Sequence, residues 1–221
     1  MTKYFTQIHK ILESNGESYE EKYPEIAQKN VFSISTLAHS SASQVHWKLK
    51  GQKGQYPYES NVGKAFFLGR AQHEFIQKRM SNCVSEYPLE YATPNFKLLG
   101  HIDLLDTNNN YVLELKTTKR HKFREKVNDA TKCYECGLEQ KESCHRDTST
   151  RIREYMLQAG TYAKLMSIQT GRNFNASVFI LNGTLTEYEL TQEDIDNAFE
   201  LVLSRAKEAY EKLRFLGEIK A

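Results

Sequence analysis

The segment 96–117 constrains the fold of this chain most, because it has the pattern of two strands joined by a tight turn. Strand-like apolar runs lie on both sides of a polar break, Thr-Asn-Asn-Asn, and such a break is typical of a β-hairpin. A turn centred on Asn108 and Asn109 would place Asp103 directly across from Glu114. Their Cβ atoms would then be roughly 5 Å apart. The pattern therefore predicts two opposed carboxylates on neighbouring strands.

Lys116 extends this pattern, because side chains alternate between the two faces of a strand. It is expected on the same face as Asp103 and Glu114. Opposed carboxylates repel each other, and Mg²⁺ or Mn²⁺ would remove the repulsion while taking the oxygen ligands it prefers. Lys116 could then orient or deprotonate an attacking water. The alternative is a solvated hairpin face on which Lys116 bridges two acids. The opposite face is expected to be apolar, with Ile102, Leu113 and Leu115.

Two helical motifs flank the hairpin. Upstream, Gly69 and His73 lie in Leu-Gly-Arg-Ala-Gln-His-Glu-Phe-Ile, and downstream Gln158 and Tyr162 lie in Tyr-Met-Leu-Gln-Ala-Gly-Thr-Tyr. With the hairpin between them, the chain over residues 69–162 resembles the PD-(D/E)xK nuclease superfamily, and more narrowly its RecB-like and Cas4-like branch. The resemblance implies an α/β fold with a restriction-endonuclease-like core, in which helices flank a mixed central sheet.

The resemblance also implies roles for single residues. The metal ligands would be His73, Asp103, Glu114 and the main-chain carbonyl of Leu115. Lys116 would position the nucleophile, and Gln158 and Tyr162 would orient it or the DNA. Each of these has a structural alternative: His73 as an ordinary helix histidine, and Gln158 with Tyr162 as a polar pair within one helix.

A cysteine-bearing segment follows the hairpin, and its spacing is typical of a metal site. Cys133 and Cys136 form a C-x₂-C pair, and Cys144 with His145 follows within a dozen residues. Structural Zn²⁺ held by these four side chains is the preferred interpretation. Because ligation of one ion by adjacent residues is strained, His121 is an alternative to His145. The segment has too few apolar residues to fold alone, so the metal would supply its stability.

An iron–sulfur cluster is the alternative at these cysteines, with Cys83 as the fourth thiolate. The resemblance suggests it, since Cas4-like proteins carry four cysteines around one cluster. The chain departs from that pattern, because Ser40, Ser41 and Ala42 stand where an early cysteine is expected, and no cysteine follows Tyr162. The family's cluster therefore does not transfer position by position.

The net charge is small, so any DNA-binding surface must be local. The chain has 30 basic and 28 acidic residues, a formal net charge of +2. A basic run directly after the hairpin lies where a phosphate backbone would enter, and contacts there would position a strand without reading its sequence. The expected DNA-binding residues are Lys119, Arg120, Lys122, Arg124, Arg151 and Arg153. The alternative is a solvated charged face.

The expected function is metal-dependent hydrolysis of DNA phosphodiester bonds. By resemblance to RecB-like proteins, it would be an exonuclease acting on single strands or duplex ends, with a helicase or recombination partner. The alternative class is a non-catalytic nucleic-acid-binding protein with a zinc-stapled contact loop. No apolar run approaches the roughly 18 residues of a membrane span, and no signal-peptide core is present. The expected location is the cytoplasm, or the host cytoplasm for a viral protein.

The pattern along the chain predicts one domain over residues 1–221, with a helical N-terminal part over 1–60 and a cysteine-rich insertion over about 120–150. Helices are expected over residues 3–14, 34–50, 62–84, 150–170 and 191–214. Strands are expected over 88–91, 96–106, 111–117, 175–181 and 185–190. Asn182-Gly183 predicts a hairpin turn, and Thr191 with Asp194 predicts a capping box. The core is expected around Val112, Leu113, Leu115, Val178, Phe179 and Ile180.

Overall fold

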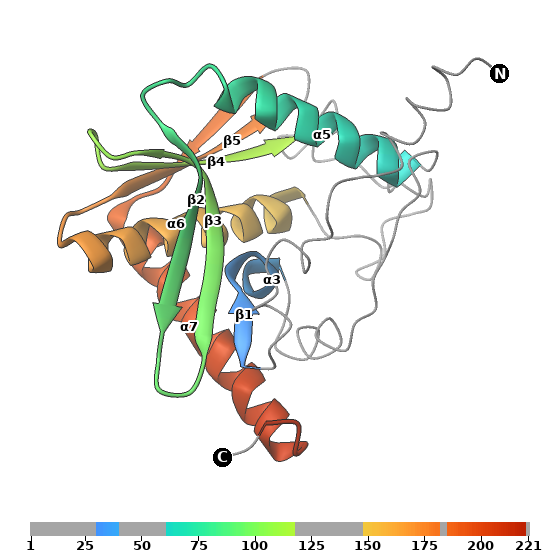
Figure 1. The fold of residues 1–221 in the computed structure, drawn as a ribbon, viewed down its shortest axis with the longest axis vertical. Coiled ribbons are helices and arrows are strands. Elements are labelled where there is room, and N and C mark those ends of the chain that lie inside the picture. The colour runs from blue at the N-terminus through green and yellow to red at the C-terminus, as the bar shows by residue number, and fades with distance from the viewer. Residues whose placement is uncertain (1–29, 40–60, 118–147, 182–184, 220–221) are drawn as a thin grey trace, which may run out of the picture.

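The computed structural model describes residues 30–39, 61–117, 148–181 and 185–219, without the side chains of residues 61–66 and 148–151. These residues form a six-stranded mixed sheet with helices packed on it (Figure 1). The strands are β1 (Val31–Ser33), β2 (Val84–Ala92), β3 (Lys97–Asp106), β4 (Tyr111–Thr117), β5 (Asn175–Leu181) and β6 (Leu185–Glu189). The helices are α3 (Ile34–His39), α5 (Asn61–Gln77), α6 (Thr148–Thr170) and α7 (Gln192–Phe215).

The β3–β4 hairpin has the predicted register. The paired residues are Leu104 with Leu113, Leu105 with Val112, and Asp106 with Tyr111. Asp106 stabilises the turn, because its Oδ1 accepts the backbone N–H groups of Asn108 and Asn109 at 3.0 and 3.1 Å. Asn110 completes the turn with φ 53°, a left-handed conformation that Asn tolerates better than most residues.

The two edges of β3 are used differently. β2 pairs with one edge along nearly the whole strand. On the other edge, β1 runs parallel to residues 97–99 and β4 runs antiparallel to residues 104–106. In the described part of the chain, the stretch 100–103 therefore has no strand partner on this edge, and β1 and β4 diverge from it in opposite directions (Figure 1). Side chains from helices can reach β3 here.

The helices cover both faces of the sheet. Ala159, Tyr162 and Leu165 of α6 join one core cluster with Val112 of β4, and α7 packs against α6. α5 lies on the other face, since a Cβ at Gly69 would come within 2.5 Å of the Thr117 Oγ1 atom, and Thr117 and Val112 point to opposite faces of β4. None of the described helices contains a stretch apolar enough to cross a bilayer.

Several predicted elements are confirmed and others need correction. Thr191 caps α7 through the predicted capping box with Asp194. β5 and β6 pair antiparallel as expected, although the predicted turn at 182–183 lies outside the described residues. The predicted helix over 62–84 is wrong at its end, because α5 stops at Gln77 and Val84 begins β2. Among the described strands, β2 pairs only with β3, so it is an edge strand there, where Pro88 is tolerated.

The predicted core is partly wrong. Val112, Val178 and Ile180 are fully buried, whereas Leu113 and Phe179 are half-buried. The predicted helix over 3–14, the end of the helix over 34–50 and the insertion lie outside the described residues.

Candidate active site

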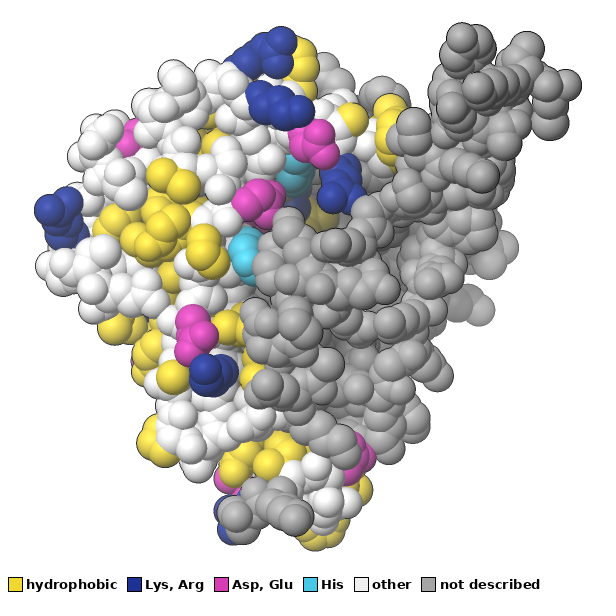
Figure 2. Space-filling view, in the orientation of Figure 1, with side chains coloured by type: hydrophobic (Ala, Val, Ile, Leu, Met, Phe, Trp, Pro, Cys, Tyr) yellow, Lys and Arg dark blue, Asp and Glu magenta, His cyan; other side chains and the backbone are white. Residues whose placement is uncertain are grey.

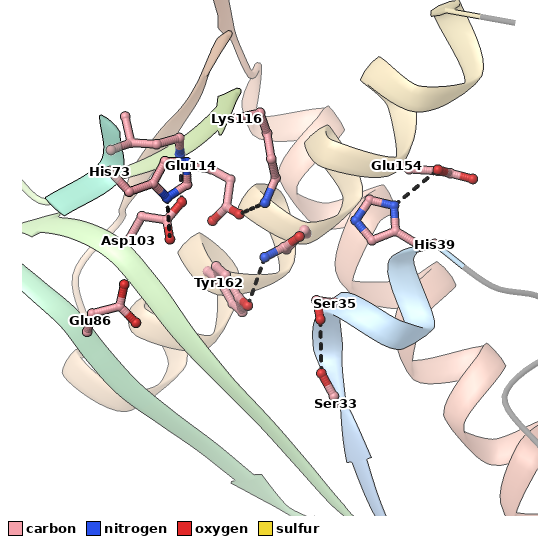
Figure 3. Close-up of polar contacts among 12 residues, drawn as sticks. Ser33, Ser35, His39, His73, Glu86, Asp103, Glu114, Lys116, Glu154 and Tyr162 are labelled. Atoms are coloured by element: carbon pink, nitrogen blue, oxygen red, sulfur yellow. Dashed lines mark hydrogen bonds and ion pairs between the residues drawn. The ribbon is translucent and has the colours of Figure 1, made fainter. Parts of the chain in front are cut away.

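Four of the predicted site residues lie together beside the unpaired edge of β3 (Figure 3). α5 contributes His73, β3 contributes Asp103, and β4 contributes Glu114 and Lys116. Figure 2 shows acidic, basic and histidine side chains gathered on the surface where α5 crosses the strands. The structure thus brings together side chains that are separated by up to 43 positions in sequence, from His73 to Lys116.

Asp103 replaces a main-chain partner at the end of the β3–β4 ladder. Its Oδ2 accepts a hydrogen bond from the backbone N–H of Leu115 at 2.7 Å, just beyond the last paired residues, Leu104 and Leu113. The Asp103 side chain is 15 % exposed. The Asp103 carboxylate therefore has two roles: it continues the hydrogen bonding between β3 and β4, and it contributes an ionisable group to the site.

The regular alternation of β3 breaks at Asp103. Ile102 and Leu105 both belong to the core cluster, although a regular strand would point them to opposite faces. Ile102 therefore shares this core with Val112, and its predicted place on the face of Leu113 and Leu115 is wrong. The prediction treated β3 as an uninterrupted strand. β3 diverges from β4 at this point, and the alternation of its side chains between the two faces is lost there.

Glu86 is a further carboxylate beside the site, and the sequence did not indicate it. It lies on β2 between residues paired with Ile102 and Leu104, and its φ of 51° is rare for a residue other than glycine. Gln77 donates to the Glu86 Oε1 at 2.9 Å and to the main-chain carbonyl of Asp103 at 3.1 Å. The only sequence signal was the position of Gln77, one helical turn after His73.

Glu114 is fully buried and only half satisfied. Its Oε1 accepts a hydrogen bond from the Lys116 ammonium, whereas its Oε2 has no hydrogen-bond partner among the described residues. Burial raises the pKa of Glu114 to about 8, and the neighbouring charge of Asp103 contributes in the same direction. A buried carboxylate oxygen without a donor costs free energy. A cation or a water would satisfy it.

The other ionisable groups of the site also have shifted pKa values. Burial lowers the pKa of His73, against the raising effect of Asp103, so the imidazole is neutral, the form that ligates metals. Burial raises the pKa of Asp103, although Lys116 and His73 oppose it. Burial lowers the pKa of Lys116, but Glu114 and Asp103 more than compensate, and its pKa lies above the ordinary value. Lys116 is therefore an ammonium.

The donor types match those that Mg²⁺ and Mn²⁺ take, namely carboxylate oxygens and an imidazole nitrogen. Within the described ranges, no three His, Cys, Asp or Glu side chains converge into a ready-made cage. Two contacts are in keeping with this: Lys116 occupies one oxygen of Glu114, and the His73 Nδ1 lies 4.0 Å from the Asp103 Oδ1. The residues fit a cation for two reasons: their donor atoms are of the types that these cations take, and Glu114 Oε2 has no hydrogen-bond partner among the described residues.

Gln158 and Tyr162 lie on α6, close to the unpaired stretch of β3. Gln158 Nε2 donates to the Tyr162 Oη at 3.1 Å, and Gln158 Oε1 has no hydrogen-bond partner in the part of the chain that is described. Tyr162 is 2 % exposed and packs on Gly100, where a Cβ would lie only 2.5 Å from the Tyr162 ring. Tyr162 is thus also a core residue. The Lys116 Nζ lies 5.4 Å from the ring centroid of Tyr155, on the same helix.

Other predicted site residues are placed only in part. The residues outside the described ranges are Lys119, Arg120, His121, Lys122, Arg124, Cys133, Cys136, Cys144 and His145. Arg151 lies in α6, and Arg153 is exposed on the same helix. Cys83 is a half-buried thiol in the turn before β2, and burial raises its pKa.

No protein-family model and no curated protein sequence matches the chain. Among solved structures, SSO0001 has a TM-score of 0.50 at 16% identity, over 91% of this chain and 85% of that one. A protein from Eubacterium rectale, provisionally described as an exonuclease, has a TM-score of 0.54 at 13% identity, over 93% of this chain and 88% of that one. At such identities the likeness concerns the fold alone. It confirms the expected fold class, a restriction-endonuclease-like mixed sheet flanked by helices.

Proposed function

We propose that this chain is a divalent-metal-dependent deoxyribonuclease that hydrolyses phosphodiester bonds. The observation that carries the proposal is the fully buried Glu114 beside Asp103, with one oxygen bonded to Lys116 and the other without a partner among the described residues. The charge of Asp103 raises the pKa of Glu114, and repulsion between neighbouring carboxylates destabilises the folded chain. A bound cation would offset the repulsion between the two carboxylates, and the pair would then serve as metal ligands. The exonuclease description of the similar Eubacterium rectale protein favours a nuclease over other hydrolases.

Each residue would have a definite role in hydrolysis. The residues that would hold Mg²⁺ or Mn²⁺ are His73, Asp103, Glu114 and the main-chain carbonyl of Leu115. When bound, the cation supplies Lewis-acid polarisation of a phosphoryl oxygen and lowers the pKa of water. Lys116, as an ammonium, positions the attacking water and balances negative charge that develops on the phosphoryl group. Gln158 and Tyr162 orient the water or the DNA strand from α6.

The finer proposal is a RecB-like or Cas4-like exonuclease that acts on single strands or duplex ends. It rests on the order of the motifs around Gly69, the hairpin and Gln158. In this proposal, residues 1–221 form one domain, and the cysteine-rich insertion holds Zn²⁺ and forms one wall of the DNA channel. The protein would act in the cytoplasm, with a helicase or recombination protein as its partner.

The test is cleavage of labelled single-stranded and double-stranded DNA by the purified protein. We expect cleavage with Mg²⁺ or Mn²⁺, none with EDTA, and none by Asp103→Asn or Lys116→Gln. Lys97→Gln is the matched control, because the Lys97 side chain is 49 % exposed and pairs with Glu90 on β2. Cleavage that survives in Asp103→Asn and Lys116→Gln would overturn the proposal.

The second candidate is a protein that binds nucleic acid without cutting it. The absence of a ready-made cage of three ligands among the described side chains favours it. It predicts DNA binding that is unaffected by Glu114→Gln, together with no hydrolysis under any metal condition. Fluorescence anisotropy of labelled DNA, measured alongside cleavage, separates the two candidates.

A further inference from the structure

The register of β2 against β3 places Glu86 opposite Asp103. Its neighbour Tyr87 pairs with Ile102, and the next position along each strand of an antiparallel pair belongs to Glu86 and Asp103. Glu114 of β4 takes the corresponding place on the other side of Asp103, one step beyond the last pair of the β3–β4 ladder. Figure 3 shows Asp103 between the two glutamates. The three acidic residues therefore form a carboxylate row across three neighbouring strands.

The carboxylate row requires compensating positive charge, because like charges opposite each other on neighbouring strands destabilise a sheet. Burial is the largest cause of the raised pKa of Glu114, and the charges of Asp103 and Glu86 act in the same direction. Lys116 bonds to the Glu114 end of the row. The other Glu114 oxygen, Oε2, is fully buried without a hydrogen-bond partner among the described residues. This oxygen independently indicates that the row binds a cation.

Glu86 is the exposed end of the carboxylate row. Its side chain is exposed, Asp103 is 15 % exposed, and Glu114 is fully buried. No three His, Cys, Asp or Glu side chains in the described ranges converge into a cage. Mg²⁺ does not need one, since it takes one or two carboxylates and completes its shell with water and phosphate oxygens. A row that is open to solvent at one end suits such a cation.

The backbone of Glu86 is strained. Its φ of 51° lies in the left-handed region, which is unfavourable for a residue with a Cβ and which glycine adopts freely. Residues held in such conformations cluster at functional sites, where the surrounding structure maintains them. A glutamate in place of glycine is therefore expected to have a function that depends on its side chain.

Gln77 holds the Glu86 carboxylate beside Asp103. It is the last residue of α5, and its Nε2 donates to the Glu86 Oε1 at 2.9 Å and to the main-chain carbonyl of Asp103 at 3.1 Å. One amide group thus joins α5 to both β2 and β3. Because Gln77 follows His73 by one helical turn, the same helix positions the imidazole and the outermost carboxylate of the row.

We propose that Glu86 is a further acidic residue of the cation-binding site, and that Gln77 is its positioning residue. The inference rests on the proposed nuclease function, in which Asp103 and Glu114 hold Mg²⁺ or Mn²⁺. Glu86 adds negative charge at the end of the row that is open to solvent, and so raises the affinity for the cation. The site then extends over three strands and not only over the β3–β4 hairpin.

The test is the affinity of the full chain for Mn²⁺ without DNA, with free Mn²⁺ measured by electron paramagnetic resonance. We expect Glu86→Gln to weaken binding by about tenfold or more. Glu90→Gln is the matched control, because Glu90 lies on the same strand and its side chain is 53 % exposed; the affinity should not change. The loss in Glu86→Gln should persist in about 1 M KCl, where a Debye length of about 3 Å screens distant charges.

Glu86→Gly separates cation binding from folding. Glycine adopts the left-handed conformation without the cost that a side chain imposes, so the metal-free variant should unfold at a higher temperature than Glu86→Gln. Its affinity for Mn²⁺ should fall as far as that of Glu86→Gln. A purely structural role of Glu86 does not predict a stabilised variant with weakened Mn²⁺ binding.

The role of Gln77 is tested by Gln77→Leu in two backgrounds. In the unaltered chain, this substitution should weaken Mn²⁺ binding, because the Glu86 carboxylate loses its donor. In Glu86→Gln it should have little further effect, since Gln77 acts on the cation through Glu86. Equal losses in both backgrounds would overturn the positioning role.

Failure of this inference is distinguishable from failure of the nuclease function. Unchanged Mn²⁺ affinity in Glu86→Gln, with DNA cleavage by the unaltered chain, would overturn the role of Glu86 alone. A loss that disappears in about 1 M KCl would overturn it in favour of a long-range charge effect. Mn²⁺ binding that depends on Glu86, without cleavage by the unaltered chain, would refute the nuclease and support the site. Absence of Mn²⁺ binding by the unaltered chain would refute both.

Discussion

The Asp103 carboxylate accepts a hydrogen bond from the backbone N–H of Leu115 at 2.7 Å, at the point where the β3–β4 ladder stops. The same side chain lies 4.0 Å from the His73 imidazole and raises the pKa of Glu114. One residue thus combines a structural acceptor with an electrostatic role. The two functions can be separated by substitution.

Asp103→Asn should separate them, because an amide oxygen still accepts from Leu115 but carries no charge. We expect no cleavage of DNA and an unfolding free energy at least as high as that of the unaltered chain in the absence of metal. Asp103→Ala leaves the Leu115 N–H without its acceptor and should cost about 1–3 kcal/mol. Denaturant titration measures both, and equal destabilisation by the two substitutions would contradict the assignment.

Stability of the metal-free protein should fall as pH rises from about 6.5 to 8. Folded Glu114 keeps its proton up to a pKa of about 8, whereas its ordinary value is 4.5, so the unfolded chain binds fewer protons in this window. His39 and His73, whose pKa values are lowered from 6.5, act in the opposite sense at lower pH. Thermal unfolding across pH measures the slope.

Glu114→Gln should flatten that slope and raise the thermal midpoint at pH 8. Glu187→Gln, an exposed glutamate of β6, should leave the slope as it is. An undiminished slope in Glu114→Gln would show that another group controls the pH dependence.

Gly69→Ala should destabilise the chain by about 1–3 kcal/mol through overpacking, because its Cβ would lie 2.5 Å from the Thr117 Oγ1. It should also displace α5 and His73, and lower activity. Thr117→Ala removes the clashing atom, so the double variant should be at least as stable as Thr117→Ala alone. A double-mutant cycle measures this coupling, and strictly additive losses would argue against the close approach.

The cysteine segment should bind zinc in stoichiometric amount. Elemental analysis of the purified protein should find one structural zinc per chain, lost in Cys133→Ser and Cys136→Ser, with no broad visible absorbance. Iron together with such an absorbance would show that the segment holds an iron–sulfur cluster and not zinc.

The sequence predicted the hairpin and most strand positions because alternation and turn residues are local signals. The register of β3 against β4 is confirmed by Leu104 with Leu113, and the start of α7 by the Thr191 capping box. The three-residue β1 gave no such signal, since so short a strand cannot display alternation and is defined by its parallel partner in β3.

The site was predictable only where its residues belong to motifs. His73, Asp103, Glu114 and Lys116 were named from spacing and resemblance, and they lie together in the structure. Glu86 could not be named, because its place depends on β2 pairing along β3. The face change at Asp103 was missed because nothing in the local pattern distinguishes a diverging strand from a regular one.

Two measurements test the metal-dependent nuclease most directly: binding of Mn²⁺ and single-turnover cleavage of DNA. Both are made on the same preparations of the unaltered chain, Glu114→Gln and Glu187→Gln. Electron paramagnetic resonance reports free Mn²⁺, and labelled DNA reports cleavage. The unaltered chain and Glu187→Gln should bind Mn²⁺ and cleave, whereas Glu114→Gln should lose both. Cleavage by Glu114→Gln at the rate of the unaltered chain, or full Mn²⁺ binding by that variant, would contradict the role given to the buried carboxylate.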